Sequence, residues 1–457
     1  VLLVSAPSPT LVAHHRKAAD LLAARPEAVA GHAAACGDHG RAGRAWLLAA
    51  EQALGRFVAS DAEALATRAI GVASELDDQE LLGRALLVRG RALDAAAEYA
   101  RALRDFERAL AAARAGRDRR LEMGALRQLA GDVPVALGRP PAECEAPLRQ
   151  SLTLAEGLGD RGIEADVLGR LSVLACSRLD FAAALALARR AEHAGHASGD
   201  ERALINGLDA LKATHAYLGD ISALAPVVAE LETRLRPSGD WWLLQWVVFE
   251  ASFVPLAAGN YDAAVAGILE AIEICRRSGF TAQEPFFLAH LGWVERLCGN
   301  LDAARATGQR AAEMAENLRH AWWATTAAAL LAGTLLATGD GASAVPMLRT
   351  ARDRADVPGA EAYLLRALAP LAEASGDATV LHAADRLLHR VRTPSDRAWL
   401  LGADAYLSIA RAWTAHGEPD RAATVLQPFR AAAHSCGWPA LVALADSGAS
   451  AASADRS

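Results

Sequence analysis

A short turn sequence recurs about every 40 residues and limits what this chain can fold into. Residues 298–304 read Cys-Gly-Asn-Leu-Asp-Ala-Ala, residues 258–264 read Ala-Gly-Asn-Tyr-Asp-Ala-Ala, and residues 338–344 read Thr-Gly-Asp-Gly-Ala-Ser-Ala. Each copy follows an apolar run with helical spacing and precedes an Ala-rich one, which predicts the tight turn of a helical hairpin. The Gly can adopt the positive φ that ends one helix, the next Asp or Asn can cap the following helix, and the small residue five positions after the Gly allows close helix packing. A fixed period of this length predicts a solenoid.

Similar turns divide most of the chain. They centre on residues 58, 98, 138, 178, 219, 259, 299, 339, 376 and 417. The turns near 58 and 98 lack the Gly and the turn near 178 reads Ser-Arg-Leu-Asp, so these three rest on helix spacing alone. We expect a helical junction over residues 1–40, a superhelix of about ten hairpins over 41–446, and a disordered Ser/Ala-rich tail over 447–457. The start at Val1 is expected for a fragment or a processed chain.

Composition supports an all-α protein that does not bind nucleic acid. The 53% hydrophobic content is raised by Ala, the best helix former, and no alternating β-type run occurs. The formal charge of −7, with Arg interleaved among acidic residues, argues against a surface for phosphates.

Cysteine usage and hydropathy indicate a cytoplasmic location. The six cysteines are scattered without a Cys-x-x-Cys pair, as expected for small buried side chains in a reducing compartment. The longest apolar run, residues 324–337, is shorter than the roughly 20 residues that span a bilayer, and no signal peptide is visible. We therefore expect no membrane segment.

Residues 290–304 carry a family resemblance. They read His-Leu-Gly-Trp-Val-Glu-Arg-Leu-Cys-Gly-Asn-Leu-Asp-Ala-Ala and resemble a tetratricopeptide repeat (TPR) motif, with Gly292 and Ala304 at the two small-residue positions. The period near 40, longer than the 34 residues of ordinary TPRs, is similar to the repeats of large bacterial regulators. These are ATP-binding LuxR-type activators, the antibiotic regulatory proteins of actinomycetes, and cyclase–ATPase–TPR fusions. The resemblance implies a right-handed α-solenoid of TPR-like hairpins.

The amino-terminal stretch extends the resemblance to those regulators. It is similar to the junction that follows their nucleotide-binding and winged-helix domains. The residues that carry this similarity are His14-His15-Arg16-Lys17-Ala18-Ala19, Pro26-Glu27-Ala28-Val29-Ala30-Gly31-His32, Cys36-Gly37-Asp38 and Trp46.

Catalytic motifs are missing from the sequence. It contains no phosphate-binding Gly-x-x-x-x-Gly-Lys-Ser/Thr loop, Gly-x-Ser-x-Gly elbow, His-Glu-x-x-His pair, kinase catalytic loop or basic helix-turn-helix. His193 and His196, with Asp200 beyond them, have a spacing that metal ligands use, but a surface pair near a helix end explains them better. We expect no enzyme activity, no cofactor and no metal.

The resemblance also predicts a binding groove. In TPR hairpins, the residues 13, 10, 6 and 3 positions before the turn Gly face the concave groove, and Trp242 and Trp322 lie one helical turn further out. Applied to this chain, the count gives an aromatic set with two cations: Trp242, Trp246, Phe249, Phe253, Phe286, Trp293, Arg296, Trp322, Tyr363 and Arg366.

Two interpretations of this set stay open. The aromatic side chains could be core that fills the space between long helices, or they could form an apolar pocket flanked by Arg296, Arg366 and Asp209. Such a pocket would bind a peptide segment, a protein partner or a small effector.

The function that the resemblance implies is a non-catalytic sensor or scaffold region of a bacterial transcriptional regulator. It would act on an attached or partner ATPase and DNA-binding module without touching nucleic acid itself, and an effector in the groove would change superhelix curvature and self-association. The alternatives are a stand-alone TPR adaptor, or the TPR region of a cyclase or ATPase fusion enzyme whose catalytic domain lies outside this chain.

Overall fold

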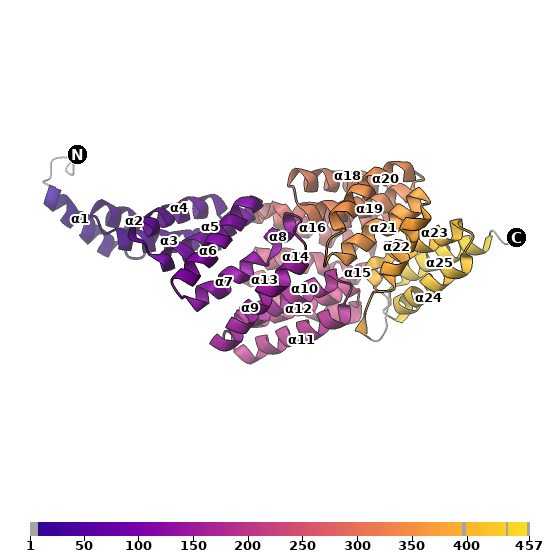
Figure 1. Cartoon of the computed structure of the whole chain (residues 1–457), viewed down its shortest axis with the longest axis horizontal. Coiled ribbons are helices and arrows are strands. Elements are labelled where there is room, and N and C mark those ends of the chain that lie inside the picture. Colours follow the sequence, from indigo (N-terminus) through magenta and orange to yellow (C-terminus); the bar gives the residue numbers. More distant parts are fainter. Residues whose placement is uncertain (1–7, 395–398, 436, 455–457) are drawn as a thin grey trace. The chain divides into compact units, whose positions relative to one another are not determined.

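A computed structural model describes residues 8–394, 399–435 and 437–454 (Figure 1). Within these ranges the secondary structure consists of α-helices, short 3₁₀-helices and turns, with one isolated β-bridge between Asp180 and Arg392. The expected all-α solenoid of TPR-like hairpins is confirmed. The chain divides into two compact units, Val1–Pro134 and Val135–Ser457, which we describe separately.

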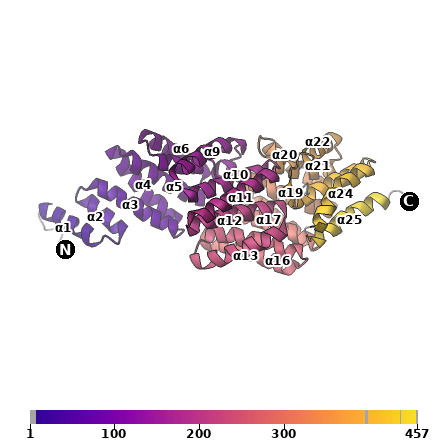
Figure 2. The same cartoon turned by 90° about the horizontal axis from the view of Figure 1, so that it is seen from below.

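The first unit is a stack of antiparallel helices that contact their neighbours in sequence (Figure 2). Its helices are α1 (Ser8–Leu21), α2 (Pro26–Ala35), α3 (His39–Gly55), α4 (Ala59–Leu76), α5 (Gln79–Ala95), α6 (Tyr99–Ala115) and α7 (Arg119–Leu129). Alanines such as Ala50, Ala53 and Ala66 are fully buried in its core, so the helices approach closely. Across that core, Arg89 pairs with the buried carboxylate of Asp105 through Nε–Oδ2 at 2.7 Å and Nη2–Oδ1 at 2.8 Å.

The second unit contains the remaining hairpins. The short helix α8 (Asp132–Ala136) crosses the boundary between the units. The second unit then contains α9 (Ala142–Leu158), α10 (Arg161–Ser177), α11 (Phe181–Ser198), α12 (Glu201–Leu218), α13 (Ile221–Ser238), α14 (Trp241–Ala251), α15 (Phe253–Ala257), α16 (Tyr261–Ser278), η1 (Thr281–Gln283), α17 (Glu284–Leu297), α18 (Leu301–Asn317), α19 (Ala321–Ala337), α20 (Gly341–Ala355), α21 (Glu361–Ser375), α22 (Ala378–Leu388), η3 (Leu400–Gly402), α23 (Ala403–Ala415), α24 (Pro419–Ser435) and α25 (Pro439–Ala454).

The ten turns lie between helices at the expected positions, which confirms the hairpin period. Gly299 has φ +80°, as predicted for the residue that ends a helix. At the three turns without a Gly, the residues Phe57, Ala97 and Leu179 adopt the left-handed conformation instead, with φ of 61°, 59° and 62°. The hairpin therefore forms even where the sequence supplies a residue that this conformation disfavours.

The predicted caps and close contacts are largely present. Asn260 Oδ1 accepts from the Ala263 N–H at 3.2 Å, and Asp220 and Asp377 cap their helices in the same way. Asn300 occupies the same position before α18 without a side-chain cap bond among the described residues. A Cβ added to Gly292 would lie 3.1 Å from the Ala304 carbonyl oxygen, which explains the glycine at position 292.

The ends of the chain differ in part from expectation. Helix α25 continues through residues 447–454, which we expected to be disordered, because alanine-rich sequence favours helix. Residues 455–457 of that tail and residues 1–7 of the junction segment lie outside the described residues. None of the described helices is long and apolar enough to cross a membrane.

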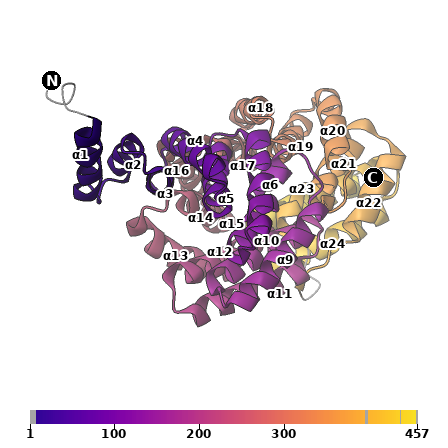
Figure 3. The same cartoon turned by 60° about the vertical axis from the view of Figure 1, so that its left-hand side comes forward.

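The hairpins of the second unit curve round until the last ones reach the first (Figure 3). Helix α10 contacts α21, and α12 contacts η3, although nearly 200 residues separate each pair in sequence. One large apolar core accordingly runs from α10 to α25.

Candidate functional site

The first helices of the hairpins form the inner layer of the second unit. Helix α10 packs on α12, α17 on α19, and α21 on α19, α23 and α10. The ten predicted groove residues lie on α14, α15, α17, α19 and α21, which include the first helices of their hairpins.

Burial separates the ten predicted groove residues into two classes. Trp322, Phe249, Phe253, Trp293 and Phe286 are buried, with 0 to 6% of their surface exposed, whereas Trp242, Trp246, Arg296, Tyr363 and Arg366 are partly exposed. The burial of the first five is what the core interpretation expects. A ligand-binding role for the set as a whole stays a prediction.

Most of the aromatic residues form one interior cluster. The Trp246 ring lies 5.5 Å from Phe286 and 5.0 Å from Phe287, and Phe286 lies 4.5 Å from Trp323. The count from the turns missed Phe287 and Trp323, which are adjacent in sequence to predicted positions. Their apolar character was visible in the sequence, but a long helix buried on several sides shows no clear periodicity.

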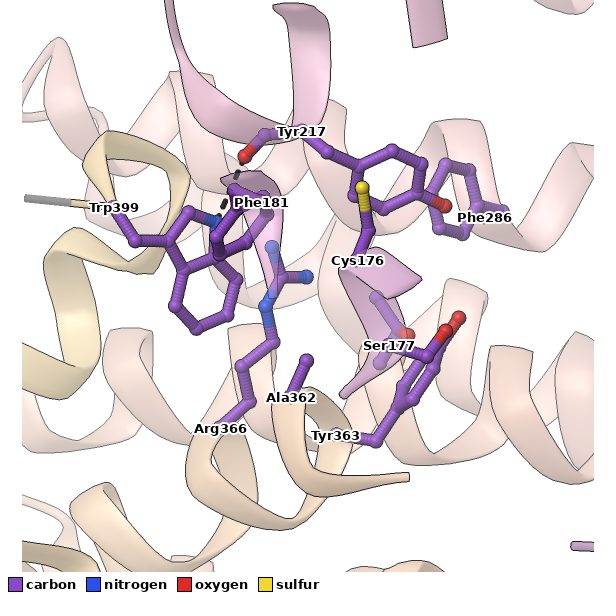
Figure 4. Close-up of a pocket in the computed structure, with 10 residues that line it drawn as sticks. Cys176, Ser177, Phe181, Tyr217, Phe286, Ala362, Tyr363, Arg366 and Trp399 are labelled. Carbon is purple, nitrogen blue, oxygen red and sulfur yellow. Dashed lines mark hydrogen bonds between the residues drawn. The ribbon is translucent and has the colours of Figure 1, made fainter. Parts of the chain in front are cut away.

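Three of the predicted residues, Phe286, Tyr363 and Arg366, line a small cavity of about 20 Å³ (Figure 4). Its wall comprises Cys176, Ser177, Phe181, Tyr217, Phe286, Thr326, Ala362, Tyr363, Arg366 and Trp399. Helices α10, α11, α12, α17, α19 and α21 therefore all contribute to this wall, with Trp399 added from the connection before η3. We call these ten residues the inner pocket.

Arg366 is the cation of the inner pocket. Its guanidinium points among the labelled side chains of Figure 4, with Cζ 5.1 Å from the centre of the Trp399 ring. Nη2 donates to the Leu401 carbonyl oxygen at 3.3 Å. Burial lowers the pKa of Arg366 from its ordinary value, but a guanidinium retains its charge in proteins.

The neighbouring groups of the inner pocket are neutral. Burial raises the pKa of Tyr217 well above its ordinary value and does the same for the Cys176 thiol. Tyr217 is therefore a phenol and Cys176 a thiol at neutral pH. A protonated, buried thiol is a poor nucleophile, so the chemistry that the pocket offers is binding through one cation, hydroxyl groups and aromatic rings.

Further charged groups lie on the same inner layer. Lys212 Nζ is 2.7 Å from Asp209 Oδ1 and 2.6 Å from Glu250 Oε2, and Lys212 and Glu250 are almost fully buried. Although burial opposes its charge, these carboxylates raise the pKa of Lys212 to about 12. Lys212, Asp209 and Glu250 are called the buried triad below.

Arg296 completes the charged inner layer. It pairs with Asp404 of α23 through Nη2–Oδ2 at 2.6 Å. Gly333 makes room for it, because a Cβ there would lie 2.1 Å from Arg296 Nη1. The register therefore placed Arg296 on the inner layer, whereas its partner Asp404 belongs to a hairpin more than 100 residues later.

The last hairpins reach back to the first through specific hydrogen bonds. Trp399 Nε1 donates to the Tyr217 carbonyl oxygen at 2.8 Å, and Trp438 Nε1 donates to the Gly219 carbonyl oxygen at 3.1 Å. The Arg392 carbonyl oxygen accepts from the Phe181 N–H at 2.7 Å. We call Arg392, Trp399 and Trp438 the carboxy-terminal clasp.

Metal binding receives no support from the described side chains, among which no group of three His, Cys, Asp or Glu could hold an ion. His193 and His196 are exposed on α11.

Comparison with known proteins identifies the fold. No family model matches the sequence, and no curated protein matches it. Among solved structures, a Rap protein complexed with competence and sporulation factor is 14% identical with a TM-score of 0.56, and the match covers 86% of this chain and 98% of the Rap chain. A STAND ATPase with a tetratricopeptide repeat sensor from Pyrococcus horikoshii matches at 14% identity and a TM-score of 0.39, over 72% of this chain and 52% of that one. At this identity the likeness to the Rap protein shows a shared fold alone, a TPR-like helical array.

Proposed function

We propose that this chain is the effector-binding sensor or scaffold region of a bacterial signal-responsive transcriptional regulator. It is not an enzyme itself, works in the cytoplasm, and acts on an attached or partner ATPase and DNA-binding module. The observation that supports this proposal most strongly is the concentration of charged and hydroxyl side chains on the inner layer of the second unit.

Buried charges are a poor way to stabilise a fold. Replacing a buried ion pair by well-packed apolar residues is often neutral or stabilising. The inner layer nevertheless contains the buried triad, the Arg296–Asp404 pair and Arg366. Convergent polar groups beside aromatic rings are the usual composition of a ligand site. Recognition of a ligand therefore explains these residues better than stability does.

The fold is compatible with this role. The Rap protein of similar fold was captured in complex with competence and sporulation factor, so a helical array of this kind can bind a regulatory factor. In our chain, Trp399 belongs both to the inner pocket and to the clasp. A ligand that moves Trp399 would break its bond to Tyr217, and the curvature of the second unit would change.

The proposal is tested by screening small metabolites and short peptides for ligands that raise the melting temperature of the full chain. Each ligand found is then examined by small-angle X-ray scattering and by sedimentation. We expect a bound effector to change the radius of gyration or the oligomeric state. Ligands that bind the second unit and leave both quantities unchanged would contradict the sensor mechanism.

The genomic surroundings test the regulator context separately. A nucleotide-binding loop encoded upstream of Val1 supports the regulator, whereas a cyclase domain there supports a fusion enzyme. A start codon directly before Val1 supports a stand-alone adaptor.

A further inference from the structure

We propose that the inner pocket binds the carboxylate of a ligand whose remaining body is apolar, with Arg366 as the pairing cation. This inference rests on the proposed function and deepens it by naming the class of effector.

The first step is the unused binding capacity of Arg366. Lys212 and Arg296, the two cations described above beside the inner pocket, already have carboxylate partners, since Lys212 lies between Asp209 and Glu250 and Arg296 pairs with Asp404 at 2.6 Å. Among the ion pairs of the described residues, none includes Arg366. A guanidinium has five N–H donors in a planar fork, and the Leu401 carbonyl takes one of them at the long distance of 3.3 Å. The fork matches the two oxygens of a carboxylate.

The second step is a hydroxyl group in the same cavity. Thr326 of α19 is 1% exposed, and its Oγ1 has no hydrogen-bond partner in the described part of the chain. Leaving a buried hydroxyl unpaired costs free energy, so such a group points to an absent partner. Thr326 and Arg366 both line the cavity, so a hydroxyl group and a guanidinium can donate hydrogen bonds to the same anion.

The third step concerns the charge and shape of the ligand. Arg366 is the one cation among the ten described residues of the inner pocket, which matches one negative charge, and the wall is otherwise largely apolar, with Phe181, Phe286 and Ala362. These properties favour a monocarboxylate with an apolar body over a multiply charged anion, which would be buried with too few cations.

The fourth step is the space that the ligand needs. A cavity of about 20 Å³ holds about one water molecule, so a carboxylate with an apolar body must displace a side chain. Trp399 is the side chain best placed to move. Its ring lies against Arg366 and 5.6 Å from Phe181, and it comes from a connection rather than from a hairpin helix. A ligand with a flat ring and a carboxylate would replace the Trp399 ring and pair with Arg366.

The test uses indole-3-acetate as the probe and indole-3-acetamide as its uncharged match, with the full chain and isothermal titration calorimetry. In Trp399→Ala, where the ring is removed, we expect the acetate to bind at least about tenfold more tightly than the acetamide, and at least about tenfold more tightly than to the wild type. The double variant Trp399→Ala/Arg366→Gln should lose the preference for the acetate. The matched control Trp399→Ala/Arg310→Gln should keep it, because Arg310 is exposed on α18.

The inference is overturned if folded Trp399→Ala binds both compounds equally, binds neither, or keeps its preference when Arg366 is replaced. Folding of each variant is checked by circular dichroism and thermal melting, and Trp399→Leu replaces Trp399→Ala if the latter is unfolded. Peptides ending in Trp with a free or an amidated carboxy terminus distinguish a peptide ligand from a free acid. If only the free-terminus peptide binds more tightly than indole-3-acetate, the ligand is a peptide terminus.

The result separates this inference from the proposed function. Arg366-dependent binding of the acids without any change in the radius of gyration would support the carboxylate site and contradict the sensor mechanism. If a different effector changes the radius of gyration and its binding does not depend on Arg366, the sensor mechanism is supported and the carboxylate site is contradicted.

Discussion

At the scale of single residues, burial keeps His290 neutral. This side chain of α17 is 5% exposed, and its Nδ1 lies 2.9 Å from the Phe286 carbonyl oxygen. Burial lowers the pKa of His290 to about 3, and the Arg366 cation adds to the shift. Protonation of this imidazole would place a second positive charge near the Arg366 guanidinium, so the folded chain excludes the proton.

The neutral His290 makes stability depend on pH. The unfolded chain takes up a proton on this residue below pH about 6.5 and the folded chain does not, so stability is lost as the pH falls from about 6.5 towards 3. We expect His290→Leu to reduce the slope of unfolding free energy against pH by about 1.4 kcal/mol per unit between pH 6 and 4. Urea unfolding at several pH values measures the slope. His196→Leu, at an exposed site, is the control, and equal slopes for His290→Leu and wild type would refute the prediction.

The turn glycine that repeats along the chain permits a matched pair of substitutions. A Cβ at Gly299 or at Gly157 would meet no atom within 4 Å, so steric clashes contribute to neither change. Gly299 has φ +80°, and Gly299→Ala should destabilise by about 1 kcal/mol. Gly157 lies inside α9, and Gly157→Ala should stabilise by about 0.5–1 kcal/mol through helix propensity. Urea denaturation of the two variants checks the sign, and changes of the same sign would contradict the backbone argument.

At the scale of elements, the hairpins are set by local sequence and could be predicted from it. A helix, a turn and a second helix involve residues close in sequence, so the ten turns followed from spacing even where Ala97 and Leu179 replace the glycine. Inner-layer placement of Arg296, Tyr363 and Arg366 followed from the same register. The burial of Phe249 and Trp293 could not be predicted in this way. The register gives the direction in which a side chain points, but it does not show which other helices pack against that side chain.

The buried triad links α12 to α14 and is predicted to be a structural weakness. Lys212→Met leaves the buried Glu250 and the partly exposed Asp209 without their cation, which should cost about 3–5 kcal/mol, mostly at Glu250. The triple variant Lys212→Met/Asp209→Asn/Glu250→Gln removes the uncompensated charges and should recover most of this loss. Urea denaturation of both variants measures the recovery. A triple variant as unstable as the single one would show that shape rather than charge holds the two helices together.

At the scale of the whole molecule, the closure of the second unit is the feature that the sequence did not reveal. Its contacts join residues near 180–220 to residues near 390–440, and neither stretch carries a repeat that points to the other. Trp399 lies in the connection between α22 and α23, outside the hairpin helices from which groove positions were counted. Of the residues that line the inner pocket, the count from the turns therefore predicted Phe286, Tyr363 and Arg366 on the hairpin helices, and it could not predict Trp399.

The clasp also completes the amino terminus of α11. The first N–H groups of a helix have no partner within it, and those of Phe181 and Ala182 donate to the Arg392 carbonyl oxygen at 2.7 and 3.3 Å. A residue more than 200 positions later thus caps this helix. Arg392 is also held directly, because its N–H donates to the Leu179 carbonyl oxygen at 2.8 Å and its Nη2 pairs with Asp180 Oδ2 at 2.7 Å. Loss of the two clasp tryptophans should therefore loosen this cap and expose its N–H groups to water more often.

Hydrogen exchange tests this closure. In Trp399→Ala/Trp438→Ala we expect the amides of Phe181 and Ala182 to exchange at least about tenfold faster, because the tryptophans bond the last hairpins to α12 and its turn and so support the distant carbonyl that protects these amides. Mass spectrometry of a peptide covering residues 179–184 provides the measurement. Trp242→Ala is the control, because Trp242 packs on Phe280 at 4.9 Å and takes no part in the clasp. Unchanged exchange in the double variant would mean that the backbone of Arg392 closes the second unit without help from the tryptophans, and the route from inner-pocket ligand to curvature through Trp399 would then fail.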